Sequence, residues 1–299
     1  MSVKLNYVIF APGYDENSGG IIALHKLCHH LNVIGESASL WPSIWVRRQS
    51  QGWWKRFRRN CKEAIWGVDF DCYPNFITPI AKRRKLSAND VVIYPEVVAG
   101  NPLGGVNVVR WLLHRPGFHT GLVDFGESDL FFKFADFADD VEVTGGAVSQ
   151  LFVFSVNSVY KNENIRERKG SCYLVRKGGD VEIAHDLAGS IKIDGLSHTD
   201  IAAIFNQCEF FYSYDEASMY SCYAAMCGCV SVVMPSSYKS REEWSVKNPA
   251  LLYGVAYGEA DIEHAYATQS LVAGHLKCLE QDSIDSIRRF VEITTSTFG

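Results

Sequence analysis

Continuous apolar runs, rather than alternating ones, mark the strands that the sequence predicts in the first half of the chain. Such runs occupy Leu5 to Ala11, Val91 to Tyr94, Val106 to Leu113 and Gln150 to Val156. Strands that are apolar on both faces are typical of a parallel sheet covered on both sides. After the first run, apolar residues recur at helical spacing from Ile21 to Leu31, and the pair Gly19-Gly20 stands where that helix is expected to begin.

A second strand and helix series begins near Ser171. Short strands are predicted in SCYLVRKGGD and GSIKIDGL, and Ser197 with Asp200 predicts the start of a helix. The run from Glu209 to Pro235 then reads as a buried strand EFFYS, a helix of small residues ending at Gly228, and a strand VSVVMP. Because short links join these three elements, we expect the two strands to be parallel. The residues after Glu259 are expected to be mostly helical.

The apolar periodicity is interrupted between residues 145 and 170, by TGGAVS and by the charged stretch KNENIRERKGS. A chain of 299 residues is long enough for two domains. We therefore predict an α/β protein with two doubly wound halves, 1–150 and 151–299, that face each other across a cleft. In such folds ligands bind at the carboxyl ends of the strands.

Composition excludes several classes of protein. With 29 Lys and Arg against 34 Asp and Glu, the net charge is -5, so no nucleic-acid partner is expected. The nine cysteines are an odd number and several lie in apolar runs, which indicates free thiols in a reducing compartment. No apolar run approaches the roughly 18 residues that span a bilayer. These features favour a cytoplasmic protein.

The loop after EFFYS carries the clearest candidate chemistry. It places Ser213, Tyr214, Asp215 and Ser218 between a buried strand and the expected start of a helix. Free N–H groups at a helix start suit a phosphate, and a nearby carboxylate can accept hydrogen bonds from ribose or sugar hydroxyls. This combination fits a nucleoside diphosphate. The alternative is that Asp215 or Glu216 simply caps the helix.

Arg176 and Lys177 end another predicted strand of the same half and precede Gly178-Gly179. Two cations there can bind the same diphosphate, since charge-assisted bonds to phosphate oxygens are strong. The alternative is a solvated pair of cations at a strand end.

The run from Gly195 to Pro235 resembles the nucleotide-binding half of GT-B glycosyltransferases, in which a strand, an acidic loop, a helix ending in Cys-Gly and an apolar strand recur in this order. The loop GYDENSGG resembles the N-terminal half of that family. The segment YPEVVAGNPLGGVNVVRWLLHRPG resembles its bacterial polysaccharide and lipopolysaccharide branch.

This resemblance implies two Rossmann-like domains, with C-terminal helices that can cross back to the first. Residues 1–150 would bind the acceptor and residues 151–299 the nucleotide-sugar. The implied reaction transfers a sugar from a nucleotide-diphosphate sugar to a glycan or lipid-linked acceptor, with no cofactor and no metal.

One feature departs from the family pattern. Retaining members carry two glutamates with seven residues between them, and the matching positions here are Asp215 and Tyr223. The missing second acid leaves open an alternative class, a catalytically inactive binding partner of another transferase. A dehydrogenase and a nucleoside triphosphatase are disfavoured, because the first strand is not followed by GxGxxG and GxxxxGK[ST] does not occur.

An inverting transferase needs a base beside the acceptor hydroxyl, and Asp15 and Glu16 supply carboxylates in the loop after the first strand. Gly19 and Gly20 would let the backbone approach the donor sugar. Three further residues are expected to line the cleft: Arg110, His114 and His119. The alternatives are ordinary loop acids and structural histidines, and inversion or retention is left open.

A basic segment lies between Val46 and Lys85, with eleven Lys or Arg against three acids. Its first part interleaves cations with tryptophans, which is typical of contact with an anionic membrane or a phosphorylated acceptor. The alternative is a solvated basic helix. The expected contact residues, which would place the protein at the inner face of a membrane, are Arg47, Arg48, Trp53, Trp54, Lys55, Arg56, Arg58 and Arg59.

Two patterns that suggest metal sites carry no prediction. His25, Cys28, His29 and His30 share one helix, but no second ligand pair at zinc-site spacing accompanies them. Asp69 and Asp71 form a DxD pattern, which we interpret as loop residues because the expected phosphate contacts lie in the second half.

Overall fold

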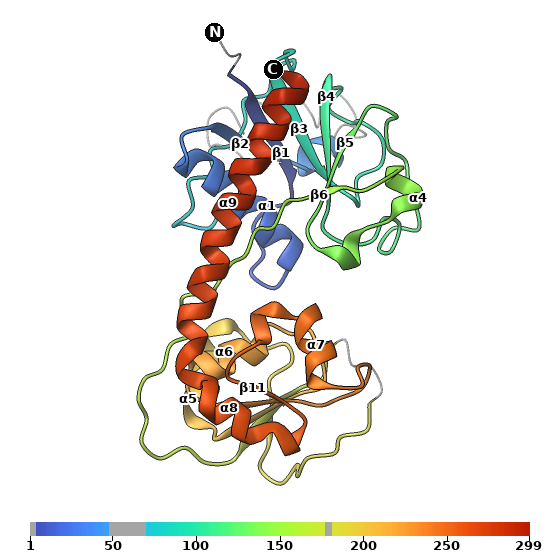
Figure 1. Cartoon of the computed structure of the whole chain (residues 1–299). Helices are drawn as coiled ribbons and strands as arrows, with labels where there is room; N and C mark the ends of the chain where they lie inside the picture. Colours follow the sequence, from blue (N-terminus) through green and yellow to red (C-terminus); the bar gives the residue numbers. More distant parts are fainter. Residues whose placement is uncertain (1–3, 48–69, 177–180) are drawn as a thin grey trace. The chain divides into compact units, whose positions relative to one another are not determined.

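A computed structural model describes residues 4–47, 70–176 and 181–299 of the chain. The chain divides into two compact units of α/β structure (Figure 1). Unit 1 contains residues 1–155 and 280–299, and unit 2 contains residues 156–279. Each unit is built on a sheet in which every neighbouring pair of strands is parallel, so the predicted α/β class is confirmed.

The sheet of unit 1 has six strands in the order β2-β1-β3-β4-β5-β6. Since β2 lies on one side of β1 and β3 on the other, the strand order reverses between β1 and β3. The carboxyl ends at such a reversal form the usual ligand-binding edge of this kind of sheet. The strand bounds are β1 Asn6–Ala11, β2 Ser37–Pro42, β3 Asp90–Pro95, β4 Asn107–Leu112, β5 Leu130–Lys133 and β6 Ser149–Gln150.

The strand predicted from Gln150 to Val156 is wrong in extent, because β6 ends at Gln150. The apolar side chains after it are nevertheless buried, including Leu151 and Val153. The N–H groups of Phe152 and Phe154 donate to Ser286 Oγ and Ser283 Oγ of the last helix, at 2.8 and 2.6 Å. These backbone groups therefore bond to helix side chains instead of to a neighbouring strand.

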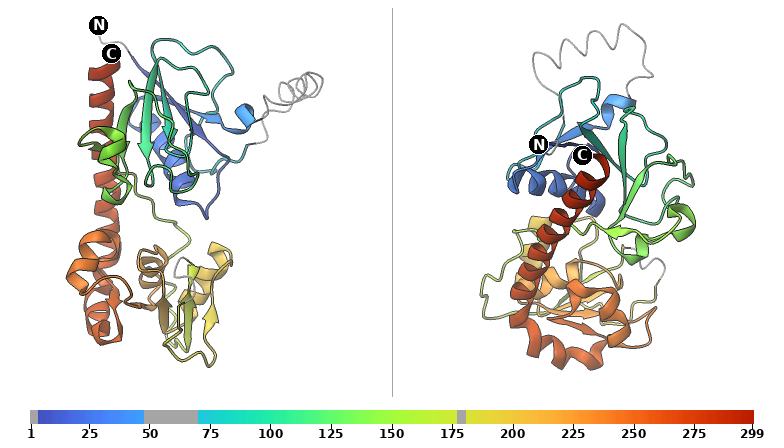
Figure 2. Two further views of the ribbon diagram at one scale, coloured as in Figure 1. Left: turned by 90° about the vertical axis from the view of Figure 1, so that its right-hand side faces the viewer. Right: turned by 45° about the horizontal axis from the view of Figure 1, so that its top comes forward.

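Two long helices, α1 Gly19–Val33 and α9 Val272–Phe298, contribute to one apolar core of unit 1. Residues of the odd-numbered face of β1, such as Ile9, pack in this core with Leu27 and Phe290. The last part of α9 runs along the unit 1 sheet (Figure 2). The opposite face of the sheet is covered by residues of connecting segments, including Leu86 and Leu103. Short helices of unit 1 are α2 Ile44–Arg47, η2 Asp136–Ala138 and α4 Val141–Thr144.

The sheet of unit 2 has five strands in the order β11-β10-β9-β7-β8. On one face α8 packs through Ala265 against Val232 and Ala256. On the other, Phe205 of α5 contacts Phe211 of β9, with ring centroids 4.9 Å apart. The bounds are β7 Ser171–Leu174, β8 Ile191–Lys192, α5 His198–Gln207, β9 Phe210–Ser213, α6 Tyr220–Met226, β10 Val230–Val233, α7 Arg241–Lys247, η4 Pro249–Leu251, β11 Val255–Tyr257, η5 Glu259–Asp261, α8 Ile262–Thr268 and η6 Gln269–Leu271.

The local predictions for unit 2 largely hold. Ser197 caps α5, since its side chain accepts the N–H of Asp200 at 3.2 Å. The parallel pairing of β9 with β10 is confirmed. The helix between them begins at Tyr220, later than the apolar pattern indicated, because the residues before it form a turn in which the Ser218 N–H donates to the Asp215 carbonyl at 3.2 Å.

Within the described residues, no helix combines the length and the apolar character needed to cross a bilayer. The eight cysteines in this part of the chain are free thiols, and six of them are buried.

Candidate functional site

In unit 2, Arg176 follows the carboxyl end of β7. Its φ of 35° lies in the left-handed region, which is costly for a residue with a side chain. The Asp194 carboxylate accepts the N–H groups of Val175 and Arg176 at 3.1 and 2.7 Å and so holds this conformation. The exposed guanidinium lies 5.5 Å from the centroid of the Tyr220 ring, at the first turn of α6. Arg176 is therefore directed toward the segment that follows the neighbouring strand β9.

Three of the predicted donor-binding residues in that segment are buried and shape the loop. Ser213 Oγ donates to the Asp215 carbonyl at 2.8 Å. The Tyr214 hydroxyl accepts the N–H of Ala184 at 2.9 Å. Ser218 Oγ accepts the N–H of Tyr220 at 3.3 Å. Asp215 keeps a partly exposed side chain, although one carboxylate oxygen accepts the N–H of Ala217 at 3.2 Å.

Glu216 joins the ends of three strands of unit 2. Its carboxylate accepts hydrogen bonds from the N–H and hydroxyl of Ser236, at 2.9 and 2.8 Å, and from the hydroxyl of Tyr257 at 2.7 Å. Burial by itself would raise the pKa of Glu216, but these donors and the N–H of Ser237 outweigh it and lower the pKa to about 2. Glu216 is therefore a structural group after β9 that is ionised at neutral pH.

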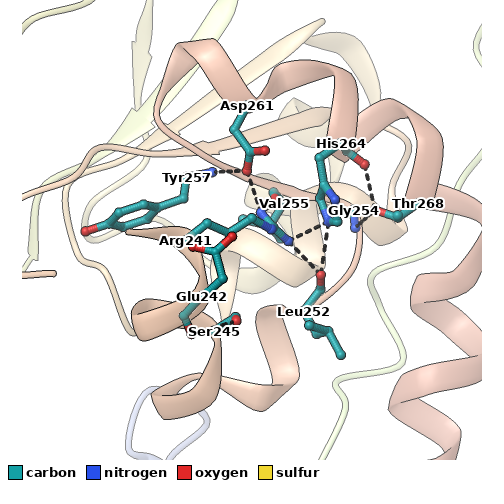
Figure 3. A network of polar contacts seen from close by, with 10 residues as sticks. All are labelled: Arg241, Glu242, Ser245, Leu252, Gly254, Val255, Tyr257, Asp261, His264 and Thr268. Carbon is teal, nitrogen blue, oxygen red and sulfur yellow. Dashed lines mark hydrogen bonds and ion pairs between the residues drawn. The ribbon is translucent and has the colours of Figure 1, made fainter. Parts of the chain in front are cut away.

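A polar network holds the end of β11, the strand whose Tyr257 donates to Glu216 (Figure 3). At its centre Arg241 forms an ion pair with Asp261 at 2.5 Å and donates to the carbonyls of Leu252 and Val255. Asp261 also accepts the N–H of Tyr257 at 2.9 Å. Together with the hydrogen bonds of Glu216, these contacts connect the loops after β9, β10 and β11.

Tyr223, at the position where the family pattern has a second acid, is packed into the interior. Its side chain is 8% exposed, and its ring stacks on Tyr160 with centroids 4.2 Å apart and planes at 9°. This position therefore presents a buried aromatic ring.

In unit 1, the loop after β1 leads directly into α1. Asp15 accepts the N–H of Asn17 at 2.9 Å, a local turn contact, and Glu16 is exposed. The helix begins at Gly19, and its N-cap residue Ser18 makes no side-chain capping bond. The first N–H groups of a helix have no partner within the helix itself. A side chain at Gly19 would meet nothing within 4 Å, so the backbone there is open to approach.

Glu96, which the sequence reasoning missed, lies at the carboxyl end of β3 and is 5% exposed. Its Oε2 accepts the N–H of Leu113, directly after β4, at 3.0 Å. Burial raises the pKa of Glu96, while backbone N–H groups and the charge of His119 partly oppose this. The signal available in the sequence was an acid directly after the apolar run from Val91 to Tyr94 and Pro95.

Two of the predicted cleft residues gather in this part of unit 1. The ring centroids of His114 and His119 are 4.9 Å apart. His114 Nδ1 accepts the N–H of Arg115 at 2.8 Å, so a neutral His114 carries its proton on Nε2. His119 is exposed on the loop that follows.

Arg110, the third predicted cleft residue, is 0% exposed. Its guanidinium pairs with Asp129 at 2.6 Å and donates to the carbonyls of Val98 and Gly100. It lies 4.9 Å from the ring centroids of both Tyr94 and Phe125. Arg110 therefore holds connecting segments onto the sheet, and its side chain is directed into the interior.

Several predicted residues lie outside the described residues: Lys177, Asp69, Arg48, Trp53, Trp54, Lys55, Arg56, Arg58 and Arg59. Arg47 ends α2, and its side chain is not described. Asp71 lies close to the loop after β1, where its carbonyl accepts the N–H of Tyr14 at 2.8 Å.

No protein-family model matches the chain, and no curated protein matches it either.

Proposed function

We propose that the protein is a metal-independent glycosyltransferase that acts on a glycan or lipid-linked acceptor in cell-surface polysaccharide synthesis. Unit 2 binds the nucleotide-diphosphate sugar, and unit 1 binds the acceptor. The two units act as Rossmann-like domains of the GT-B type that face each other across a cleft. The reaction takes place in the cytoplasm, at the inner face of a membrane.

The observation that carries this proposal is the position of Arg176 in unit 2. A strained, exposed arginine at a strand end, directed toward the loop after the adjacent strand, suits an anion at the carboxyl edge of the sheet. A guanidinium can bind two phosphate oxygens at once and stabilise the charge on a departing diphosphate. Lys177 would add a second cation, and the partly exposed Asp215 would accept a hydroxyl of the ribose or the sugar.

In unit 1, the backbone at Gly19 and Gly20 is proposed to approach the donor sugar, and His114 and His119 to lie beside the acceptor. Closing the site around both substrates would exclude water, which otherwise competes with the acceptor for the donor.

The proposal is tested by thermal unfolding with UDP, GDP, CMP and TDP. A ligand at one hundred times its dissociation constant stabilises a protein by about 2.7 kcal/mol. We expect one of these nucleotides to stabilise the wild type and Arg176→Ala to lose most of that shift. Lys169→Ala is the matched control, because Lys169 is an exposed cation just before β7, at the opposite end of the same strand. Equal shifts in both variants would contradict the proposed phosphate site.

Tyr223 favours one second candidate, an inactive binding partner of another transferase, because a buried ring stands where retaining members carry an acid. Nucleotide release from a panel of activated sugars, measured with and without acceptors, separates the two candidates. Binding of a nucleotide without turnover of any donor would favour the inactive partner.

A further inference from the structure

Buried carboxylates in the described part of unit 1 fall into two kinds. Asp90, whose side chain is 0% exposed, pairs with Arg84 at 2.5 Å. Asp129, 5% exposed at its side chain, pairs with Arg110 at 2.6 Å. Glu96 is also buried, with 5% of the residue exposed, yet within the ranges that the structure describes it forms no ion pair with a Lys or Arg. A buried carboxylate without a countercharge is costly, and such groups gather at functional sites.

The surroundings of Glu96 hold its carboxylate in place without neutralising it. The Leu113 N–H fixes Oε2 at the ends of β3 and β4. The exposed His119 is a titratable residue whose charge acts on Glu96. The ring of His114 lies next to that of His119. A side chain at Gly20, in the first turn of α1, would lie 3.6 Å from Leu113 Cδ1, so the open helix start adjoins the residue that binds Glu96.

The two carboxylates expected from the sequence have a different setting. Asp15 accepts the N–H of a neighbour in its own loop, and both Asp15 and Glu16 are exposed to solvent.

We propose that Glu96 is the general base that accepts the proton of the acceptor hydroxyl. This rests on the proposed function. In the step, the hydroxyl O–H bond breaks and its proton passes to the Glu96 carboxylate. The oxygen forms a bond to the anomeric carbon, and the bond from that carbon to the phosphate oxygen breaks, so the nucleoside diphosphate leaves with the electron pair. A base that activates the acceptor for direct displacement gives a product of inverted anomeric configuration.

Glu96→Gln is the central variant, because glutamine keeps the size and the acceptor oxygen and removes the charge. We expect the rate of transfer to fall by about 10²-fold or more, mainly in kcat, with the nucleotide-induced thermal shift unchanged. Removal of an uncompensated charge should also raise the melting temperature above that of the wild type at about pH 8 and leave no difference below about pH 4, where the carboxyl group is protonated in both states. The product configuration is read by NMR.

Asp129→Asn is the control for burial alone. It removes a carboxylate whose side chain is 5% exposed but which is paired with Arg110, so it should lower the melting temperature.

Each outcome decides a separate point. A lower melting temperature for Glu96→Gln than for the wild type, or transfer at the wild-type rate, overturns the assignment of Glu96. Retention of configuration also overturns it. A more stable Glu96→Gln in a chain that turns over no donor would reject glycosyl transfer while leaving Glu96 as an uncompensated functional carboxylate.

Discussion

Glu96 and Glu216 each follow the end of a parallel strand, β3 and β9 respectively. Their different neighbours give them different roles. The donors around Glu216 outweigh its burial and lower its pKa to about 2. Glu96 is more deeply buried with fewer donors, and burial raises its pKa. A carboxyl group with a lowered pKa stabilises the fold when ionised, whereas one with a raised pKa destabilises it when ionised. The first is therefore structural, and the second suits proton transfer.

Glu216→Gln should destabilise the protein by roughly 1.5–3 kcal/mol at neutral pH, the range for hydrogen bonds to a charged group. Because the folded pKa lies below the ordinary value of 4.5, this stabilisation is present above pH 4.5 and is lost as the pH falls toward about 2. The measurement is urea unfolding at a series of pH values. Glu209→Gln, an exposed position before β9, is the control, and equal losses in the two variants would contradict a structural role for Glu216.

At the scale of elements, the sequence predicts those helices, strands and caps that depend only on residues close together in the chain. The first strand, the start of α1 at Gly19, the Ser197 cap and the parallel pair β9 and β10 all follow from periodicity, capping residues and short links. These features need no knowledge of distant partners.

Features that depend on partners far along the chain were missed. Arg110 was expected in a cleft, but its neighbours across the sheet and Asp129 draw it inward. The burial of Glu96 depends on the pairing of β3 with β4, and the early end of β6 depends on serines of α9. The order of apolar and polar residues marks the position of Glu96 after a strand, but it contains no signal for the contacts that bury it.

Gly228, after α6, illustrates a position where backbone and packing act together. Its φ is 88°, and a Cβ there would lie 2.6 Å from Asn162 Nδ2 and 2.8 Å from Arg168 Nη2. Arg168 would have to leave the Cys227 carbonyl, which it binds at 2.6 Å. Gly228→Ala should therefore cost about 1–3 kcal/mol for overpacking in addition to about 1–2 kcal/mol for the left-handed backbone.

Gly189→Ala is the matched control for this prediction. Its φ of 75° is similar, and a Cβ there meets nothing within 4 Å, so the backbone cost alone is expected. Chemical denaturation of both variants measures the difference, and equal losses would show that the space around Gly228 is not limiting.

At the scale of the whole molecule, the end of the chain completes the core of the unit in which the chain begins. Residues 280–299 belong to unit 1. The boundary predicted at residue 150 places them in the second half, although the family resemblance implies C-terminal helices that can cross back to the first. Ile287 and Phe290 of α9 are 0% exposed in the core that contains β1 and α1. The hydroxyl groups of Tyr7 and Thr294 are hydrogen-bonded at 2.8 Å. Because this core joins β1 to α9, unit 1 is formed from two separate parts of the sequence, residues 1–155 and 280–299.

Phe290→Ala tests how strongly unit 1 depends on that helix. The Phe290 ring lies 5.5 Å from Tyr7 and 4.8 Å from Phe132, measured between centroids, so its removal leaves a cavity between α9 and the sheet. We expect a loss of about 3–5 kcal/mol in the free energy of unfolding, measured by denaturant titration. Arg289→Ala, at an exposed position of the same turn, should change the free energy of unfolding by less than about 0.5 kcal/mol.

Since the proposed phosphate contact at Arg176 lies in unit 2, the nucleotide dissociation constant of folded Phe290→Ala should equal that of the wild type. A loss in the free energy of unfolding of Phe290→Ala below about 1 kcal/mol would mean that α9 contributes little to the core of unit 1.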